Sequence, residues 1–211
     1  MATRRLAEQQ PESFAFTPEN LEKAKAHIAK YPQGYQASAV MPLLDIAQRQ
    51  NDGWVCEPAI RVIAEMLEMP YIRVLEVATF YTMYNLHPIG KHHVQVCTTT
   101  PCWLRGSSAV AEACKKRLGI GNGETTDDGM FTLSEVECLG ACVNAPMMQI
   151  DDDYYEDLDA ESTVKILDAL AKGETPKPGP QNGRQTSAPA GGLTTLKGPT
   201  TKKGEGKNAR G

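Results

Sequence analysis

Residues 131–158 of the chain read FTLSEVECLGACVNAPMMQIDDDYYEDL, and their pattern predicts most of a small sheet. Its composition predicts three short strands, over 131–138, 147–151 and 153–158. The three consecutive aspartates are typical of a tight hairpin between the last two strands. Cys138 and Cys142 follow the first strand on a loop that contains Gly140. The stretch therefore places two thiols at a strand-to-loop junction of a small sheet.

The sequence on either side of this stretch predicts a small layered fold. Upstream, HHVQVCT predicts a further strand over 92–98, and TPCWLRGSSAVAEACKKRLG predicts one helix that begins near Pro101. Downstream, ESTVKILDALAKG predicts a closing helix with Gly173 as its C-cap. The order opens strand–helix–strand and closes with a helix. It favours a small α/β layer of thioredoxin-like type over residues 91–172.

Residues 17–90 predict a bundle of about four helices. Thr17 and Pro18 have the pattern of an N-cap followed by a proline at the first helical position. Further helices are predicted over 38–51, 57–69 and 70–84. The last of these would carry Phe80, Tyr81 and Tyr84 on one helix, where such residues usually serve a core or an interface. Nothing in this region is typical of a catalytic site.

The two ends of the chain differ in character from its middle. Residues 1–16 form an N-terminal extension whose two arginines are not followed by the apolar run of a secretion signal. Residues 173–211 are rich in Gly, Pro, Thr and Lys and predict a disordered basic tail. The tail has seven basic and two acidic residues, a net +5, which leaves −9 for the preceding body and −4 for the whole chain. An acidic body argues against nucleic-acid binding by the folded part.

The chain has six cysteines, and no apolar stretch approaches the length that a transmembrane helix needs. Thiols in a chain that is not secreted stay reduced unless a cofactor claims them. Four of the six form two pairs, C-x4-C at Cys97 and Cys102 and C-x3-C at Cys138 and Cys142. Four thiolates that converge from two loops suit zinc or an iron–sulfur cluster. Cys56 and Cys114 fit inert core positions and are assigned no role.

The spacing of the pairs favours a [2Fe–2S] cluster over zinc. Structural zinc sites usually close a tight C-x2-C on one ion, whereas both pairs here are wider, as expected if each pair holds one iron. Residues 98–100, all threonines, and Gly140 could donate hydrogen bonds to the sulfurs. Disulfides are disfavoured in a reducing compartment, and thioredoxin-type chemistry needs C-x-x-C. His92 and His93 are expected at solvent or strand-edge positions rather than as Rieske-like ligands.

Two stretches, YTMYNLHPIGKHHVQVCTTTPCWLRGS and FTLSEVECLGACVNAPMMQIDDDYYEDL, closely resemble the small thioredoxin-like [2Fe–2S] subunit of respiratory complex I, NADH:ubiquinone oxidoreductase. The resemblance runs from about Phe14 to Lys172. It implies an N-terminal helical bundle followed by a thioredoxin-like [2Fe–2S] ferredoxin domain; the disordered C-terminal tail, predicted from composition, has no counterpart in it. It also implies the cluster ligands, which are Cys97, Cys102, Cys138 and Cys142.

The same resemblance implies an electron-transfer subunit that is not catalytic alone. One [2Fe–2S] cluster of the N1a type would exchange single electrons with FMN in a larger partner subunit, which also binds NADH. The chain would lie in the peripheral arm of the proton-translocating complex, without a transmembrane segment of its own. That arm lies on the cytoplasmic side of the bacterial inner membrane, or on the matrix side in mitochondria.

Three other functions remain open from the residues themselves. The first is the equivalent diaphorase subunit of an NAD-linked hydrogenase or formate dehydrogenase. The second, from another class, is a structural zinc-binding module that mediates interactions. The third is a thiol oxidoreductase, which would work through a titratable dithiol instead of iron.

Overall fold

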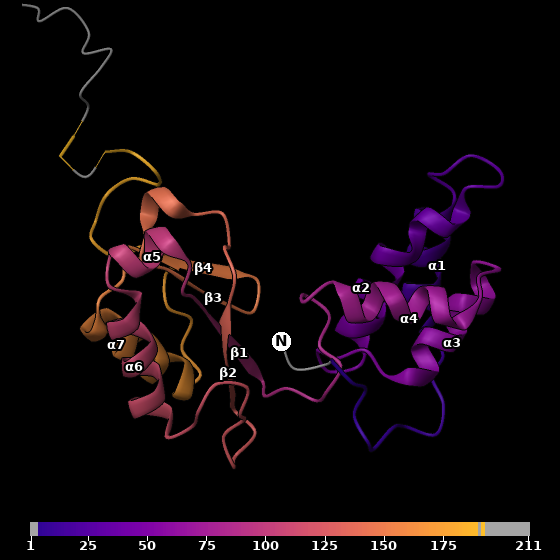
Figure 1. Cartoon of the computed structure of the whole chain (residues 1–211), viewed down its shortest axis with the longest axis horizontal. Coiled ribbons are helices and arrows are strands. Elements are labelled where there is room, and N and C mark those ends of the chain that lie inside the picture. Colours follow the sequence, from indigo (N-terminus) through magenta and orange to yellow (C-terminus); the bar gives the residue numbers. More distant parts are fainter. Residues whose placement is uncertain (1–3, 190, 193–211) are drawn as a thin grey trace, which may run out of the picture. The chain divides into compact units, whose positions relative to one another are not determined.

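The computed structural model of the chain is drawn in Figure 1. The residues that it describes are 4–189, 191 and 192. They divide into two compact units: a helical unit of residues 4–93 and 124–132, and an α/β unit of residues 94–123 and the described residues from 133 onward. None of the helices within these described residues is both long and apolar enough to span a lipid bilayer.

The helical unit contains the predicted four helices and one short 3₁₀ helix. These are α1 (Pro18–Ile28), η1 (Gln36–Ala39), α2 (Val40–Gln50), α3 (Glu57–Met66) and α4 (Tyr71–Phe80). Thr17 caps α1 as predicted, because its side chain accepts a hydrogen bond from the backbone N–H of Asn20 at 3.3 Å. The unit has its own core, whose fully buried members include Leu43, Leu44, Ile60, Ile63 and Val74.

The prediction that α4 continues to Tyr84 is wrong, because the helix ends at Phe80. Tyr81 takes an extended backbone conformation, and the chain then turns so that the Tyr84 side chain is fully buried. The Tyr84 hydroxyl donates to the backbone oxygen of Met41 at 2.9 Å. Phe80 is 76% exposed. The aromatic residues of this stretch therefore divide between the core and the surface instead of sharing one helix.

The segment before α1 lies against the helical unit. The guanidinium of Arg4 donates to backbone oxygens at and just beyond the end of α4, those of Ala78, Thr79, Tyr81 and Tyr84. The backbone N–H of Ala7 donates to the oxygen of Leu86 at 2.9 Å. These bonds occupy carbonyl groups that a helix end leaves without a partner inside the helix.

The α/β fold has the predicted element order, with one added strand and with the predicted first helix divided into two. Its elements are β1 (His92–Cys97), α5 (Thr100–Leu104), α6 (Ser107–Leu118), β2 (Phe131–Val136), η2 (Cys142–Asn144), β3 (Met148–Ile150), β4 (Asp153–Glu156), α7 (Ala160–Ala171) and β5 (Gly179–Pro180). The five strands form one sheet in the order β2-β1-β3-β4-β5. Helices α6 and α7 contact each other next to this sheet (Figure 1).

Strand β1 lies inside the sheet between β2 and β3. Backbone N–H groups at 91, 92 and 98 donate to oxygens at 129, 130 and 136, and these partners advance together as in a parallel pair. Strands β1 and β3 are antiparallel, with Val94 opposite Ile150. Strands β3 and β4 form the predicted antiparallel hairpin, and its aspartate turn includes Asp151 with a φ of 54°.

The prediction of a single helix over 100–119 is wrong, because two helices occupy these residues. Helix α5 ends at Leu104, and Gly106 then takes a φ of +98° before α6 begins. That conformation suits glycine and cannot occur inside a right-handed helix. The break separates the short helix that carries Cys102 from the longer one that packs on α7.

The prediction of a disordered tail from residue 173 is wrong for residues 174–189. Strand β5 pairs in parallel with β4, and Arg184 forms an ion pair with Asp157 at 2.6 Å. Composition could not reveal this order, because backbone pairing and one polar side chain hold the segment instead of apolar burial. Residue 190 and residues 193–211, the rest of the predicted tail, lie outside the described residues.

Candidate metal centre

The sheet topology brings the two cysteine loops to one edge. Cys97 is the last residue of β1, and Cys102 lies in the first turn of α5. Strand β2 ends at Val136, and the loop after it carries Cys138 and Cys142, the second at the start of η2. Because β1 and β2 are neighbours and run in the same direction, both loops leave the sheet at the same edge.

The first pair, Cys97 and Cys102, is buried. Each cysteine is 1% exposed, and both belong to a small apolar cluster with Ala145 and Met147. The Cys97 sulfur lies 3.3 Å from the hydroxyl of Thr99. This pair is therefore shielded from water by apolar side chains.

The second pair, Cys138 and Cys142, is exposed. Its two sulfurs lie 3.6 Å apart, and the backbone N–H of Gly140 donates to the Cys138 sulfur at 3.4 Å. Gly140 has a φ of +85°, which lets the loop turn back so that both thiols point the same way. The hydroxyl of Tyr154 donates to the oxygen of Leu139 at 2.7 Å and ties this loop to β4.

The thiols of the two pairs influence one another. Burial raises the pKa of the Cys102 thiol to about 12, and the Cys97 and Cys142 thiols add to that rise. Burial also acts to raise the pKa of Cys97, but hydrogen bonds from Thr99 and from the backbone of Leu139 outweigh it, so this pKa is lowered. The pKa of Cys142 is raised, first by its hydrogen bond with Cys138, then by burial and by the charges of Cys138 and Cys97. Cysteines of one pair therefore shift the pKa values of cysteines in the other pair.

The geometry of the second pair suits a shared metal ion. In a tetrahedral site with metal–sulfur bonds near 2.3 Å, two thiolates on one ion lie roughly 3.8 Å apart. The Cys138–Cys142 separation of 3.6 Å is close to that value. Within the described part of the chain, no three His, Cys, Asp or Glu side chains are arranged to hold a single ion. The separation within the second pair is compatible with two thiolates on one iron of a two-iron cluster.

Backbone groups supply several of the donors around the sulfurs. Of the residues expected to donate, Gly140 does so, and the hydroxyl of Thr99 lies within hydrogen-bond distance of the Cys97 sulfur. The N–H groups of Leu139 and Met147 also reach sulfurs, those of Cys97 and Cys102 respectively. Sequence reasoning missed these two because a backbone donor has no residue signature. Such N–H groups stabilise anionic thiolates and tune the potential of a bound cluster.

His92 and His93 begin strand β1, at the opposite end of the strand from Cys97. His93 is buried in β1, so the expectation of a solvent or strand-edge position is wrong for it. Cys97 lies four residues further along the strand, roughly 13 Å away at about 3.3 Å per residue, which excludes a Rieske-like ligand role for His93. Cys56 and Cys114 are fully buried in helical surroundings, as predicted, and burial raises the pKa of the Cys114 thiol to about 12.

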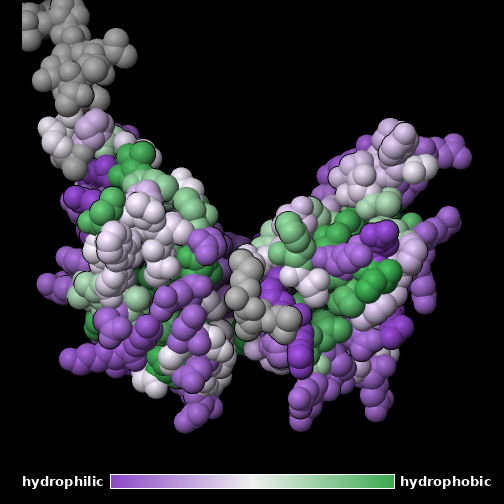
Figure 2. Space-filling model, viewed as in Figure 1, coloured by the Kyte–Doolittle hydropathy of each residue, from purple (hydrophilic) through white to green (hydrophobic). Residues whose placement is uncertain are grey.

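Three large apolar side chains beside the cysteines face outward. Trp103 and Leu104 follow Cys102 directly, and Val143 follows Cys142; each is more than 60% exposed. Figure 2 shows apolar groups on the surface of this unit among polar ones. Exposed large apolar side chains beside a candidate site are typical of a protein contact surface.

Comparison with known proteins gives one family and several close relatives. Residues 24–171 match the family model described as thioredoxin-like [2Fe–2S] ferredoxin. A subunit of the NADH-quinone oxidoreductase of Rickettsia conorii is 60% identical over 158 residues, which span 75% of this chain and 95% of the relative. The corresponding subunit from Rickettsia prowazekii is 60% identical over 156 residues, 74% of this chain and 88% of the relative.

Two solved structures share the fold at low identity. They are the air-oxidized and H2-reduced states of an NAD+-reducing [NiFe]-hydrogenase, each 18% identical to this chain. The TM-scores are 0.53 and 0.54, with 62% and 64% of this chain covered. Each match spans 23% of the hydrogenase chain, so this chain corresponds to one part of that larger protein.

Proposed function

The chain belongs to the family of thioredoxin-like [2Fe–2S] ferredoxins, with close relatives among the subunits of NADH-quinone oxidoreductase, and from this membership we propose that it carries electrons. One [2Fe–2S] cluster binds to Cys97, Cys102, Cys138 and Cys142. The observation that carries this proposal is the meeting of two thiol pairs at one sheet edge, with the second pair at a separation suited to one iron.

The cluster, when bound, accepts and returns single electrons. The residues of the chain determine where it sits and how it is shielded. Cys97 and Cys102 hold one side among apolar side chains, while Cys138 and Cys142 hold the other side at the surface. The N–H groups of Gly140 and Leu139 offset negative charge on the sulfurs.

The partner is the larger protein that holds FMN and binds NADH. The exposed cysteine pair and the neighbouring Trp103, Leu104 and Val143 support contact through this edge, because electron exchange requires close approach of the two redox centres. Hydride transfer from NADH occurs in the partner, so the chain is a non-catalytic subunit. The cluster is of the N1a type, and the chain lies in the peripheral arm of a proton-translocating complex. That arm is on the cytoplasmic side of a bacterial inner membrane, or the matrix side if mitochondrial.

Metal analysis and EPR of the full chain test the cluster. The protein is purified anaerobically, assayed for iron and acid-labile sulfide, and reduced with dithionite for EPR. Two irons, two sulfides and an S = 1/2 signal near g = 2 are expected, since a reduced [2Fe–2S] cluster has one unpaired electron. One zinc with no sulfide and no signal would overturn the proposal and leave a structural module.

The parent complex is tested by what co-purifies with an affinity-tagged full chain from its own cells. Other subunits of NADH-quinone oxidoreductase and stoichiometric FMN are expected in the purified complex, whereas the isolated chain should contain no flavin. Recovery of hydrogenase or formate dehydrogenase subunits instead would assign the chain to one of those enzymes.

A further inference from the structure

The segment 174–189 packs against the α/β unit beyond the residues that the family model matches. Strand β5 places Gly179 opposite Tyr155 and Pro180 opposite Glu156. The backbone N–H of Gln181 then donates to the oxygen of Glu156 at 2.9 Å. The segment is therefore anchored to β4 before it reaches the cysteine loop.

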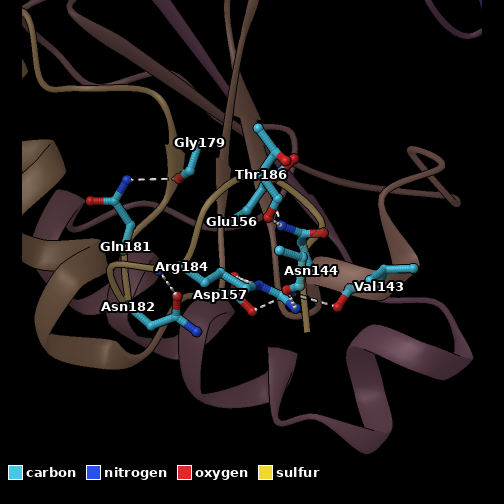
Figure 3. Close-up of polar contacts among 10 residues, drawn as sticks. Val143, Asn144, Glu156, Asp157, Gly179, Gln181, Asn182, Arg184 and Thr186 are labelled. Carbon is cyan, nitrogen blue, oxygen red and sulfur yellow. Dashed lines mark hydrogen bonds and ion pairs between the residues drawn. The ribbon is translucent and has the colours of Figure 1, made fainter. Parts of the chain in front are cut away.

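Arg184 joins this segment to the chain just after Cys142 (Figure 3). Its guanidinium forms a two-point ion pair with Asp157, Nε to Oδ2 at 2.6 Å and Nη2 to Oδ1 at 2.7 Å. The two side chains are only 10% and 8% exposed. Nη2 also donates to the backbone oxygen of Val143 at 2.6 Å. One buried guanidinium thus binds both the residue just after β4 and the residue that follows Cys142.

Asn144 makes a second set of bonds at the same place (Figure 3). Its side-chain nitrogen donates to the carboxylate of Glu156 at 2.7 Å and to the backbone oxygen of Thr186 at 2.9 Å. Its own backbone oxygen accepts from the N–H of Asp157 at 2.8 Å. Asn144 is buried, so these bonds are shielded from water.

These bonds act on the loop that carries the exposed cysteine pair. Cys142, Val143 and Asn144 form the short helix η2, and Cys142 and Val143 are exposed. On its other side the loop is tied down by the Tyr154 hydroxyl bond to Leu139. The C-terminal side of Cys142 is therefore held by polar contacts both with the end of β4 and, through Arg184 and Thr186, with the segment 174–189.

We propose that Arg184 is a positioning residue for Cys142 and that residues 174–189 clamp the loop of the exposed cysteine pair. The expected effect of Arg184 on bound iron rests on the proposed function, whereas its effect on the loop does not. Arg184 touches neither sulfur; it acts through Val143 and Asp157. Loss of its fork-shaped contacts frees η2 to move, and the Cys138–Cys142 geometry changes with it.

The test uses the full chain with Arg184→Gln, Arg184→Lys and the control Arg117→Gln. Arg117 pairs with Asp168 at 2.5 Å between α6 and α7, so its replacement removes an arginine–aspartate pair from the same unit without touching the loop. Hydrogen–deuterium exchange of peptides covering 139–147 is followed in the iron-free protein. EPR line shape and midpoint potential are recorded for the iron-loaded protein.

Arg184→Gln should speed exchange in these peptides by about tenfold, equivalent to ~1.4 kcal/mol of local opening, and should alter the EPR signal. Arg184→Lys keeps the charge but cannot bind Asp157 and Val143 together, so it should show the same changes to a smaller extent. Arg117→Gln should show neither. If Arg184→Gln fails to fold, the lysine variant decides the question.

Exchange and EPR that match the wild type in both Arg184 variants would overturn the clamp. A lysine variant that behaves as wild type while the glutamine variant does not would show that charge alone matters, and positioning would be rejected. Absence of iron and sulfide from the wild type would refute the proposed function, whereas the exchange measurement on the iron-free chain would still decide the clamp.

Discussion

Replacement of Gly140 by alanine tests how the loop of the exposed cysteine pair is shaped. Gly140 has a φ of +85°, and a Cβ atom added there meets no other atom within 4 Å. The substitution is therefore free of steric clash, and its cost is conformational. A left-handed backbone costs a residue with a Cβ about 1–2 kcal/mol relative to glycine.

The loop can respond to this cost in two ways. If the backbone stays in place, the free energy of unfolding falls by about 1–2 kcal/mol. If the backbone moves, the strain is relieved, but the bond from the Gly140 N–H to the Cys138 sulfur is lost. The 3.6 Å separation of the Cys138 and Cys142 sulfurs changes as well. Iron content should then fall and the EPR signal should broaden.

Gly119→Ala is the matched control. Gly119 has a φ of +71°, ends α6, and also has no atom within 4 Å of an added Cβ. Its replacement should reduce the free energy of unfolding by a similar amount, because the conformational cost is the same. Since Gly119 lies a whole helix away from Cys102, iron content and EPR should match the wild type.

The assay combines urea unfolding, followed by circular dichroism, with iron analysis and EPR of the reduced full chain. The reasoning fails if Gly140→Ala has the stability, iron content and EPR signal of the wild type. It also fails if Gly119→Ala disturbs the iron site as strongly as Gly140→Ala. Either result would mean that the left-handed turn at residue 140 does not shape the site.

Burial, hydrogen bonding and charge each lead to one more prediction. In the iron-free chain a maleimide should label the two exposed cysteines of the candidate site well before the fully buried Cys114. Peptide mass spectrometry measures the order of labelling, and early labelling of Cys114 would contradict its burial in the core. Tyr154→Phe removes the 2.7 Å hydrogen bond from the Tyr154 hydroxyl to the backbone oxygen of Leu139. This change should lower the free energy of unfolding by about 1 kcal/mol and speed the loss of iron to a chelator. An unchanged rate of iron loss would count against a role of this bond in holding the loop. The pKa of Glu156 is raised above 4.5, mainly by burial and then by Asp157, against the effects of Arg184 and Asn144. The carboxyl of Glu156 therefore holds its proton more tightly in the folded state than in the unfolded state. Because of this difference, the free energy of unfolding falls as the pH rises from the pKa of Glu156 in the unfolded state through its pKa in the folded state. Glu156→Gln should therefore gain stability relative to the wild type across that pH range in urea unfolding, and a constant difference would disprove the shift.

Local features of the sequence determined most of the secondary structure. Thr17 and Pro18 start α1 because a hydroxyl acceptor and a fixed φ suit a helix N-terminus wherever it occurs. The aspartate hairpin and the helix that Gly173 follows are also settled by residues within a few positions of each other. The pairing of the cysteines at C-x4-C and C-x3-C is likewise a property of the chain alone, and it pointed to a thiolate site before any fold was known.

The ends of helices were less predictable where two backbone conformations have similar local free energy. Helix α4 could have continued past Phe80 on propensity, but burial of Tyr84 against Met41 requires the chain to leave the helix. The break at Gly106 has the same character, because a single glycine inside a helical pattern is tolerated as readily as it ends a helix. At the end of α4, a contact distant in sequence decides between conformations of similar local free energy.

Only the tertiary structure decided how the thiols differ and what supports them. The sequence assigns the four cysteines equal status, yet two are buried beside Met147 and two are exposed, because burial depends on which loop the sheet covers. The ion pair of Arg184 with Asp157 joins residues 27 positions apart, and only Arg184 lies in the segment whose composition predicts disorder. Composition and periodicity predict interactions between residues that are close together in the sequence. Long-range polar pairing depends on where the backbone brings distant groups together, and that is settled only when the whole chain has folded.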